Sequence, residues 1–348
     1  MERNYESLHE ASLREPARFW AKEAERLHWQ TPWRDVLDTS HAPFFRWFCG
    51  GKTNLCYNAV DRHVLEGRGD QPAILWESAE EETSRTITFG ELQSEATGFA
   101  AVLRRSGVEQ GDRVLIYMPM VPEAVIAVLA CARIGAIHSV VFAGFSYESL
   151  ADRIDDCTPK ALVCADGSRR KQKVIPLKSI VDRALDQARA DVASVVVLDR
   201  GIASWTPLDG RDVRWRDAMA ACADSRLEPV PVESTAPSYI LYTSGTTGKP
   251  KGVSRDTGGH MVALHASMRQ IYGCTPNDVF WSTSDIGWVV GHSYIIYGPL
   301  LYGIPTVLYE GTPDHPDPGV WWRIIAKHGV TVLFTAPTGM RMLRKYPI

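Results

Sequence analysis

Hydroxyl side chains, glycines and a lysine are gathered in one stretch of the chain, the ten residues TSGTTGKPKG that follow Tyr242. Glycine adopts positive φ readily, which lets backbone N–H groups converge on an anion. The hydroxyls add donors, and Lys249 adds a compact positive charge. These residue types predict a polyphosphate-binding loop, whose expected contacts are Thr243, Ser244, Gly245, Thr246, Thr247, Gly248 and Lys249.

A Walker-type loop is the main alternative phosphate-binding structure. It has four residues between its glycines, followed by Lys and by a Ser or Thr that opens a helix. Here only two residues separate Gly245 from Gly248, and Pro250 follows Lys249 and disfavours helical geometry there. We therefore expect an extended loop that is not a Walker loop. A solvated Gly/Thr connection that binds nothing is the remaining alternative.

The spacing of cysteines and histidines gives little support to metal or disulfide chemistry. The seven cysteines are scattered, odd in number and never spaced as CxxC, and the ten histidines show no HExxH pattern. Disulfide frameworks and zinc sites depend on such spacings. We expect buried free thiols and no metal site.

Alternating helical and apolar stretches must position the loop. Between residues 89 and 235 the pattern predicts helices at 89–103, 122–134 and 176–190, and strands at 113–118, 138–142, 160–164 and 194–198. After residue 236 it predicts strands at 238–242, 279–281, 306–308 and 331–334, and helices near 258–272, 291–302 and 319–328. Such alternation indicates an α/β fold with largely parallel sheets covered by helices.

The same pattern predicts three regions. Residues 1–88 are rich in Trp and Pro with little periodicity, which indicates a segment wrapped on a larger body. Residues 89–235 form a first α/β subdomain, and residues 236–348 form a second one that carries the loop.

Composition excludes several classes of function. With 45% hydrophobic and 23% charged residues the chain is expected to be globular. Its net charge of -3 provides no positive field for nucleic acid or an anionic membrane. Because the sequence opens without a leader pattern and contains no run of eighteen apolar residues, we expect a cytoplasmic protein. Oligomeric state is not predicted.

The string YTSGTTGKPKGV, residues 242–253, closely resembles the phosphate-binding signature of the adenylate-forming superfamily. Further stretches resemble the acetyl/propionyl-CoA synthetase branch of that superfamily, more the propionyl type, and they are residues 47–54, 57–58, 61–63, 142–146, 284–294 and 335–338. The resemblance implies the large-domain fold of these enzymes, with mixed, largely parallel sheets flanked by helices. It also implies that this chain ends before the small carboxy-terminal domain.

The branch binds the CoA nucleotide through a short basic segment, and Arg170 and Lys173 take the matching positions. Arg offers a planar fork and Lys a point charge, both suited to phosphate. The family usually has two small residues between these positions, where this chain has Lys171 and Gln172. Asp314 falls where the family often has an amide that contacts CoA, and Val290 is carried over as a further CoA contact. A solvated basic turn is the alternative.

Trp288, Val289 and Val290 resemble the segment that lines the acyl pocket, and His292 beside them is a candidate catalytic residue, with a packed core histidine as the alternative. Acetyl-specific relatives tend to carry Thr at the position of Val290. Valine has one more methyl group and no hydroxyl, which favours a slightly longer acyl chain such as propionate.

The resemblance implies that ATP, CoA, Mg²⁺ and a short carboxylic acid are the ligands. Carboxylate attack on the ATP α-phosphorus gives an acyl-adenylate and pyrophosphate, and the CoA thiol then displaces AMP. Lys249 is expected to assist the first step. The family's adenine-binding segment and catalytic lysine lie further along the chain than Ile348, so we expect this chain alone to be inactive. An acetate-CoA ligase and a truncated, non-catalytic nucleotide- or CoA-binding fragment are the alternatives.

Overall fold

A seven-stranded sheet forms one side of the molecule in the computed structural model, which describes residues 5–243 and 250–346. All its neighbouring strands run parallel except the last pair, β14 and β15, which is antiparallel. In spatial order the strands are β12 (Asp212–Arg214), β11 (Ser194–Leu198), β8 (Ala161–Ala165), β6 (Arg113–Tyr117), β7 (Ile137–Val140), β14 (Pro237–Thr243) and β15 (Lys251–Asp256).

Both faces of this sheet are covered by helices, as its apolar strands require. Along β6, Val114 and Ile116 pack in the cluster that contains α3 and α4, whereas Leu115 and Tyr117 face α5 and α6 on the other side. The covering helices are α3 (Phe89–Arg105), α4 (Pro122–Arg133), α5 (Tyr147–Cys157) and α6 (Leu177–Gln187), with α7 (Trp215–Ala220) packed on α3 and β11.

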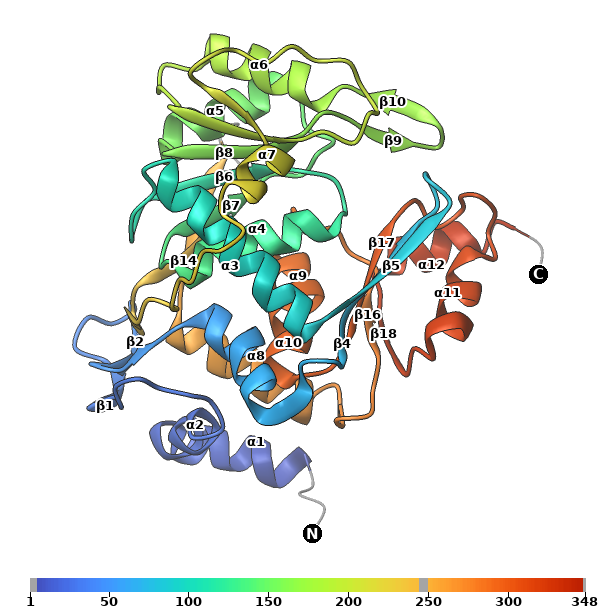
Figure 1. The fold of residues 1–348 in the computed structure, drawn as a ribbon. Helices are drawn as coiled ribbons and strands as arrows, with labels where there is room; N and C mark the ends of the chain where they lie inside the picture. Colours follow the sequence, from blue (N-terminus) through green and yellow to red (C-terminus); the bar gives the residue numbers. More distant parts are fainter. Residues whose placement is uncertain (1–4, 244–249, 347–348) are drawn as a thin grey trace.

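A five-stranded sheet forms the other side (Figure 1). Its order is β18 (Val332–Phe334), β16 (Phe280–Ser282), β17 (Thr306–Glu310), β4 (Pro72–Ser78) and β5 (Thr83–Thr88), and only the β4–β5 pair is antiparallel. Helices α11 (Val320–His328) and α12 (Pro337–Leu343) cover its outer face.

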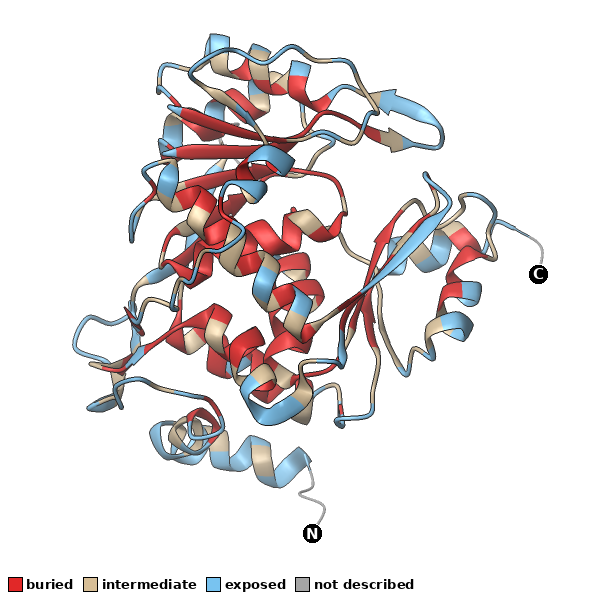
Figure 2. Cartoon of the chain, viewed as in Figure 1, coloured by how far each residue is buried: buried red, intermediate tan, exposed pale blue. Residues whose placement is uncertain are grey.

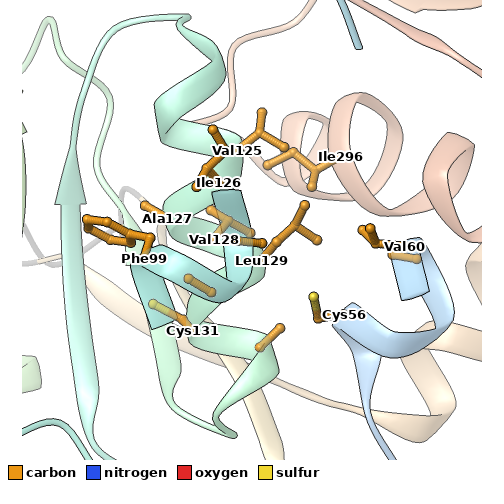
Figure 3. Packing of buried hydrophobic residues seen from close by; sticks show 14 of the residues in the cluster. Cys56, Val60, Phe99, Val125, Ile126, Ala127, Val128, Leu129, Cys131 and Ile296 are labelled. Atoms are coloured by element: carbon orange, nitrogen blue, oxygen red, sulfur yellow. The ribbon is translucent and has the colours of Figure 1, made fainter. Parts of the chain in front are cut away.

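A layer of helices fills the space between the two sheets. Every residue of α4 except Glu123 is buried, as expected for a helix that is apolar on all sides. Figure 3 shows Val125–Leu129 of α4 packed among Cys56, Val60, Phe99 and Ile296. The other elements of this layer are α8 (Gly258–Gln270), α9 (Val289–Gly291), α10 (Gly298–Tyr302) and the π-helices η1 (Tyr57–Asp61) and η3 (His292–Tyr297).

The amino-terminal segment is more regular than its sequence suggests. It forms α1 (Tyr5–Arg14), α2 (Pro16–Ala24), the β1–β2 pair (Asp35–Asp38, Arg46–Cys49), β3 (Lys52–Thr53), which pairs with β13 (Val232–Glu233), and η2 (Val64–Arg68). Figure 2 shows that α1 is largely exposed, while the central strands of the first sheet and the central helices are buried. Short elements with one exposed face give little periodic signal, which is why the pattern missed them.

The predicted α/β class with largely parallel sheets flanked by helices is confirmed. The sheets cross the boundaries predicted at 88 and 235, however. Strands β4 and β5 lie before residue 89 and complete the second sheet, and β14 and β15 lie after residue 235 and extend the first. Strand pairing joins distant segments, and local periodicity carries no information on which strands pair.

Two smaller findings concern thiols and membranes. All seven cysteines are free and all but Cys49 are buried, which confirms the predicted free thiols. None of the described helices combines the length and apolar character needed to cross a lipid bilayer.

Candidate functional site

A crevice lies where the carboxyl ends of strands from both sheets meet. Residues that follow β7 and β8 form one wall, and residues that follow β4, β16 and β17 form the other. One cavity of about 160 Å³ is lined by Phe142, Gly144, Ser168, Arg170 and Ile175 on the first side and by Glu80, Asp285, Glu310, Gly311 and Thr312 on the second. A second cavity of about 120 Å³ adjoins it, because both share Met120, Asp285 and Gly311. Ligands of open α/β sheets bind at this edge.

The hairpin of β9 (Ser168–Arg170) and β10 (Lys173–Ile175) follows β8 of the first sheet and projects toward the side of the second sheet (Figure 1), and Ser168, Arg170 and Ile175 line the larger cavity. Arg170 and Lys173 are directly paired across the hairpin. Residues paired in this way have Cβ atoms about 5 Å apart, so two positive charges lie side by side. Among the described residues neither side chain forms an ion pair with a carboxylate, and both residues are exposed. Two adjacent, unpaired cations favour binding of an anion such as a phosphate.

The two-residue turn of this hairpin is stabilised by Glu80. Lys171 and Gln172 have φ values of 50° and 68°, the left-handed conformation that a tight hairpin turn requires and that non-glycine residues adopt at a cost. The buried carboxylate of Glu80 accepts hydrogen bonds from the backbone N–H of Lys171 at 2.7 Å and of Gln172 at 3.1 Å. Glu80 therefore joins the tip of the hairpin to the loop between β4 and β5.

Asp314 reaches the same hairpin tip from the loop after β17. Its Oδ2 atom lies 2.7 Å from Nζ of Lys171, and the same carboxylate accepts hydrogen bonds from Thr312 and Tyr346. The hydrogen bond from Lys171 lowers the pKa of Asp314 to about 2, so this carboxylate is ionised at neutral pH. Asp314 therefore lies near Arg170, as its predicted role requires, but its carboxylate is bound to Lys171.

Asp285 is a polar residue of the crevice that the sequence analysis did not single out. It lines both cavities, and its Oδ1 accepts a hydrogen bond from the backbone N–H of Gly287 at 2.7 Å. Burial raises its pKa to about 6, although Arg170 acts in the opposite direction. Asp285 lies in the stretch 284–294 that resembles the family, and this position could have marked it as a candidate site residue.

The predicted acyl-pocket segment borders the crevice beside an aromatic cluster. The Trp288 ring lies 5.9 Å from the Phe142 ring and 6.2 Å from the Phe145 ring, measured between centroids. Trp288 and Val289 are about half exposed, and Val290 begins the short α9 helix with Val289. These side chains lie next to a cavity wall, since Phe142 lines the larger cavity.

His292 lies in the packed helical layer, and it lines neither of the two cavities of the crevice. Its ring stacks on Tyr239 with 4.7 Å between centroids, and its Nδ1 atom lies 3.1 Å from the backbone oxygen of Trp288. Burial lowers its pKa to about 4, which makes the ring neutral at physiological pH. The structure thus places His292 as a core residue behind the pocket segment.

The predicted phosphate loop leaves the first sheet at the same edge. Strand β14 runs parallel to β7 and ends at Thr243, which pairs with Lys251 at the start of β15. The loop therefore connects two antiparallel strands, unlike a Walker loop, which joins a strand to a helix. The predicted contacts Ser244, Gly245, Thr246, Thr247, Gly248 and Lys249 lie outside the described residues.

Comparison with known proteins gives two family matches. Residues 61–347 match the family described as AMP-binding enzyme, and residues 5–59 match the acetyl-coenzyme A synthetase N-terminus.

Propionate–CoA ligase of Escherichia coli is 50% identical over 344 residues, which cover 99% of this chain and 55% of that protein. Human mitochondrial acyl-CoA synthetase short-chain family member 3 is 47% identical over 98% of this chain and 50% of that protein. Acetyl-coenzyme A synthetase of Pyrobaculum arsenaticum is 46% identical over 98% of this chain and 52% of that protein. The chain spans about half the length of these relatives.

Proposed function

The chain belongs to the AMP-binding enzyme family, and from this we propose that it is part of a short-chain acyl-CoA synthetase. The reaction consumes ATP, a short carboxylate and CoA, and yields acyl-CoA, AMP and pyrophosphate through an acyl-adenylate. The predicted resemblance to the acetyl/propionyl-CoA synthetase branch is confirmed by both family matches and by the relatives.

One observation supports the proposal: Arg170 lines the crevice, and the other two predicted binding segments lie beside it or at the same sheet edge. Arg170 lines the larger cavity and pairs with Lys173 across the hairpin, the Trp288 ring packs on Phe142 of the same cavity, and β14 ends at Thr243 at the carboxyl edge of the first sheet. The pocket segment suits an acyl group, the basic hairpin suits the phosphates of CoA, and the loop that follows β14 suits the phosphates of ATP. Their convergence allows an acid to react first with a nucleotide and then with a thiol.

The first step depends mainly on electrostatic stabilisation, because charge develops on the transferring phosphoryl group. We propose that the loop hydroxyls and Lys249 hold the β- and γ-phosphates while the carboxylate oxygen attacks the α-phosphorus. Within the described ranges no group of three His, Cys, Asp or Glu side chains could hold a metal ion. We propose that Mg²⁺ enters bound to the ATP phosphates, a common mode for this ion, where it would offset their charge.

We propose propionate as the preferred acid, with acetate as the alternative. Val290 has an apolar side chain and follows Trp288 by two residues, and the Trp288 ring lies beside Phe142 and Phe145; these groups suit an additional methylene. The names of the relatives include both a propionate ligase and acetyl-CoA synthetases, so they do not distinguish the two acids. A cytoplasmic location stays a prediction, since the name of one relative places that protein in mitochondria.

The test is acid-dependent exchange of labelled pyrophosphate into ATP, catalysed by the complete product of the gene that encodes this chain. We expect kcat/KM for propionate to exceed that for acetate by about tenfold, the discrimination that one methylene provides. Val290→Thr, which introduces a hydroxyl at nearly constant volume, should reduce this preference. Exchange with no short acid, or exchange only with long or aromatic acids, would refute the proposal.

A further inference from the structure

The β9–β10 hairpin depends on contacts at its tip to hold its position. Its two strands have three residues each. Among the described strands they pair only with each other and belong to neither of the two larger sheets. An isolated two-stranded hairpin is at best marginally stable. The tip contacts described above come from two loops of the second sheet, through Glu80 after β4 and Asp314 after β17. The hairpin is thus attached to one sheet through the chain and to the other through its tip.

The three cations of the hairpin tip have different partners. Lys171 is paired with Asp314, whereas Arg170 and Lys173 on either side of the turn form no ion pair among the described residues. The Asp314 side chain is 8% exposed and lies close to the cavity wall at Thr312. Left without a cation, this carboxylate would repel any phosphate that approaches Arg170. Lys171 cancels that charge without using either of the two free cations.

Both members of this pair depart from the family pattern noted in the sequence. Lys171 stands at one of two positions that usually hold small residues, and Asp314 stands where an amide is common. A lysine alone would add a further free cation to the hairpin, and an aspartate alone would add an uncompensated negative charge beside it. The 2.7 Å contact between them pairs the two charges, so that each offsets the other.

We propose that Lys171 and Asp314 form a neutral clasp that fixes the hairpin against the second sheet and so sets the affinity of the crevice for CoA. In this role Lys171 is a positioning residue: it neutralises Asp314 and holds Arg170 at the cavity, while Glu80 fixes the backbone of the turn. The inference rests on the proposed function, because it takes the ligand of Arg170 and Lys173 to be CoA.

The test is a double-mutant cycle in the complete gene product, with Lys171→Met, Asp314→Asn and both changes together. The readouts are the Kd for CoA from isothermal titration calorimetry and acid-dependent pyrophosphate exchange. We expect Lys171→Met to weaken CoA binding by about tenfold, because it leaves Asp314 unpaired beside the phosphates. The double variant should bind CoA at least threefold more tightly than Lys171→Met alone, and exchange should stay within twofold of wild type throughout.

A matched control is Lys327→Met. Lys327 is 52% exposed, as Lys171 is, and also pairs with a carboxylate, that of Glu77, but it lines neither cavity of the crevice. It should leave the Kd for CoA unchanged. Pantetheine, which lacks the nucleotide, should bind all variants alike if the clasp acts on the phosphates.

Additive effects in the cycle would refute the clasp, because uncoupled residues act independently. Tighter CoA binding after Lys171→Met would refute it too, since the pair would then obstruct the site. Failure of the proposed function gives a different result, namely no acid-dependent exchange in the wild-type protein. Calorimetry still measures the coupling in that case.

Discussion

Reversing the charges of Arg170 and Lys173 together is expected to raise the KM for CoA by about 100-fold in the complete gene product. Each residue is exposed, is paired with the other across the hairpin and forms no ion pair among the described residues, so both are available to a phosphate. A hydrogen bond to a charged group contributes about 1.5–3 kcal/mol, and about 1.4 kcal/mol corresponds to tenfold in affinity. Two such contacts account for the expected change.

The double variant Arg170→Glu/Lys173→Glu should leave acid-dependent pyrophosphate exchange within twofold, because CoA takes no part in that half-reaction. Arg14→Glu/Arg18→Glu is the matched control, since it reverses two exposed charges on α1 and α2, which are separate from the crevice. Steady-state kinetics with CoA as the varied substrate gives the result. A parallel loss of exchange activity would show that the hairpin serves the fold or the first step instead.

Arg133→Ala is expected to lower the free energy of unfolding by about 3–5 kcal/mol, as removal of one partner from a buried ion pair does. Nη1 of Arg133 donates to both carboxylate oxygens of Asp61, at 2.8 and 2.9 Å, and Nε donates to the backbone oxygen of Leu227. Both charged side chains are nearly inaccessible to solvent. The substitution leaves the Asp61 carboxylate buried without its cation. Among the described side chains it then keeps a hydrogen bond from Gln93 and a weak one from the Cys56 thiol.

This ion pair joins the end of η1 to the end of α4, and it therefore fixes the amino-terminal segment on the central helical layer. Urea unfolding of the 348-residue chain, followed by circular dichroism, measures the change. Arg14→Ala provides the comparison, because its pair with Glu10 is exposed on α1 and such pairs contribute about 0–1 kcal/mol. A change below about 1 kcal/mol for Arg133→Ala would mean that Asp61 finds another partner or becomes solvated.

Periodicity in the sequence predicted the principal strands well because those strands are buried on both faces. The stretch expected at 113–118 is β6 at Arg113–Tyr117, and the stretch expected at 194–198 is β11. Helix α5 was missed, although the side-chain oxygen of Ser146 caps it by accepting a hydrogen bond from the backbone N–H of Ser149. The local sequence pattern also could not predict which strands share a sheet. Strand β4, for example, pairs with β17, more than two hundred residues away.

The candidate site was only partly visible in the sequence for a similar reason. Motifs indicated Arg170, Lys173 and the Trp288–Val290 segment. The structure places Arg170 in the crevice, Lys173 opposite it on the hairpin, and the Trp288 ring against Phe142 of the cavity wall, and their binding roles stay predictions. Glu80 belongs to no motif that we identified, and Asp285 lies in the 284–294 stretch without having been singled out there; the structure brings out both through their contacts with the hairpin and the cavities. A single carboxylate in a sequence carries no sign of such a role, because its partner is distant along the chain.

Transfer of oxygen-18 from labelled propionate tests most directly whether the crevice belongs to an enzyme that forms an acyl-adenylate. The complete gene product would be incubated with ATP, Mg²⁺, CoA and propionate labelled in both carboxylate oxygens, and the products analysed by mass spectrometry. If a carboxylate oxygen attacks the α-phosphorus, that oxygen remains on phosphorus when the thiol displaces the nucleotide, so one labelled oxygen must appear in AMP. Label in inorganic phosphate, with ADP as the other product, would show an acyl-phosphate route and contradict this account.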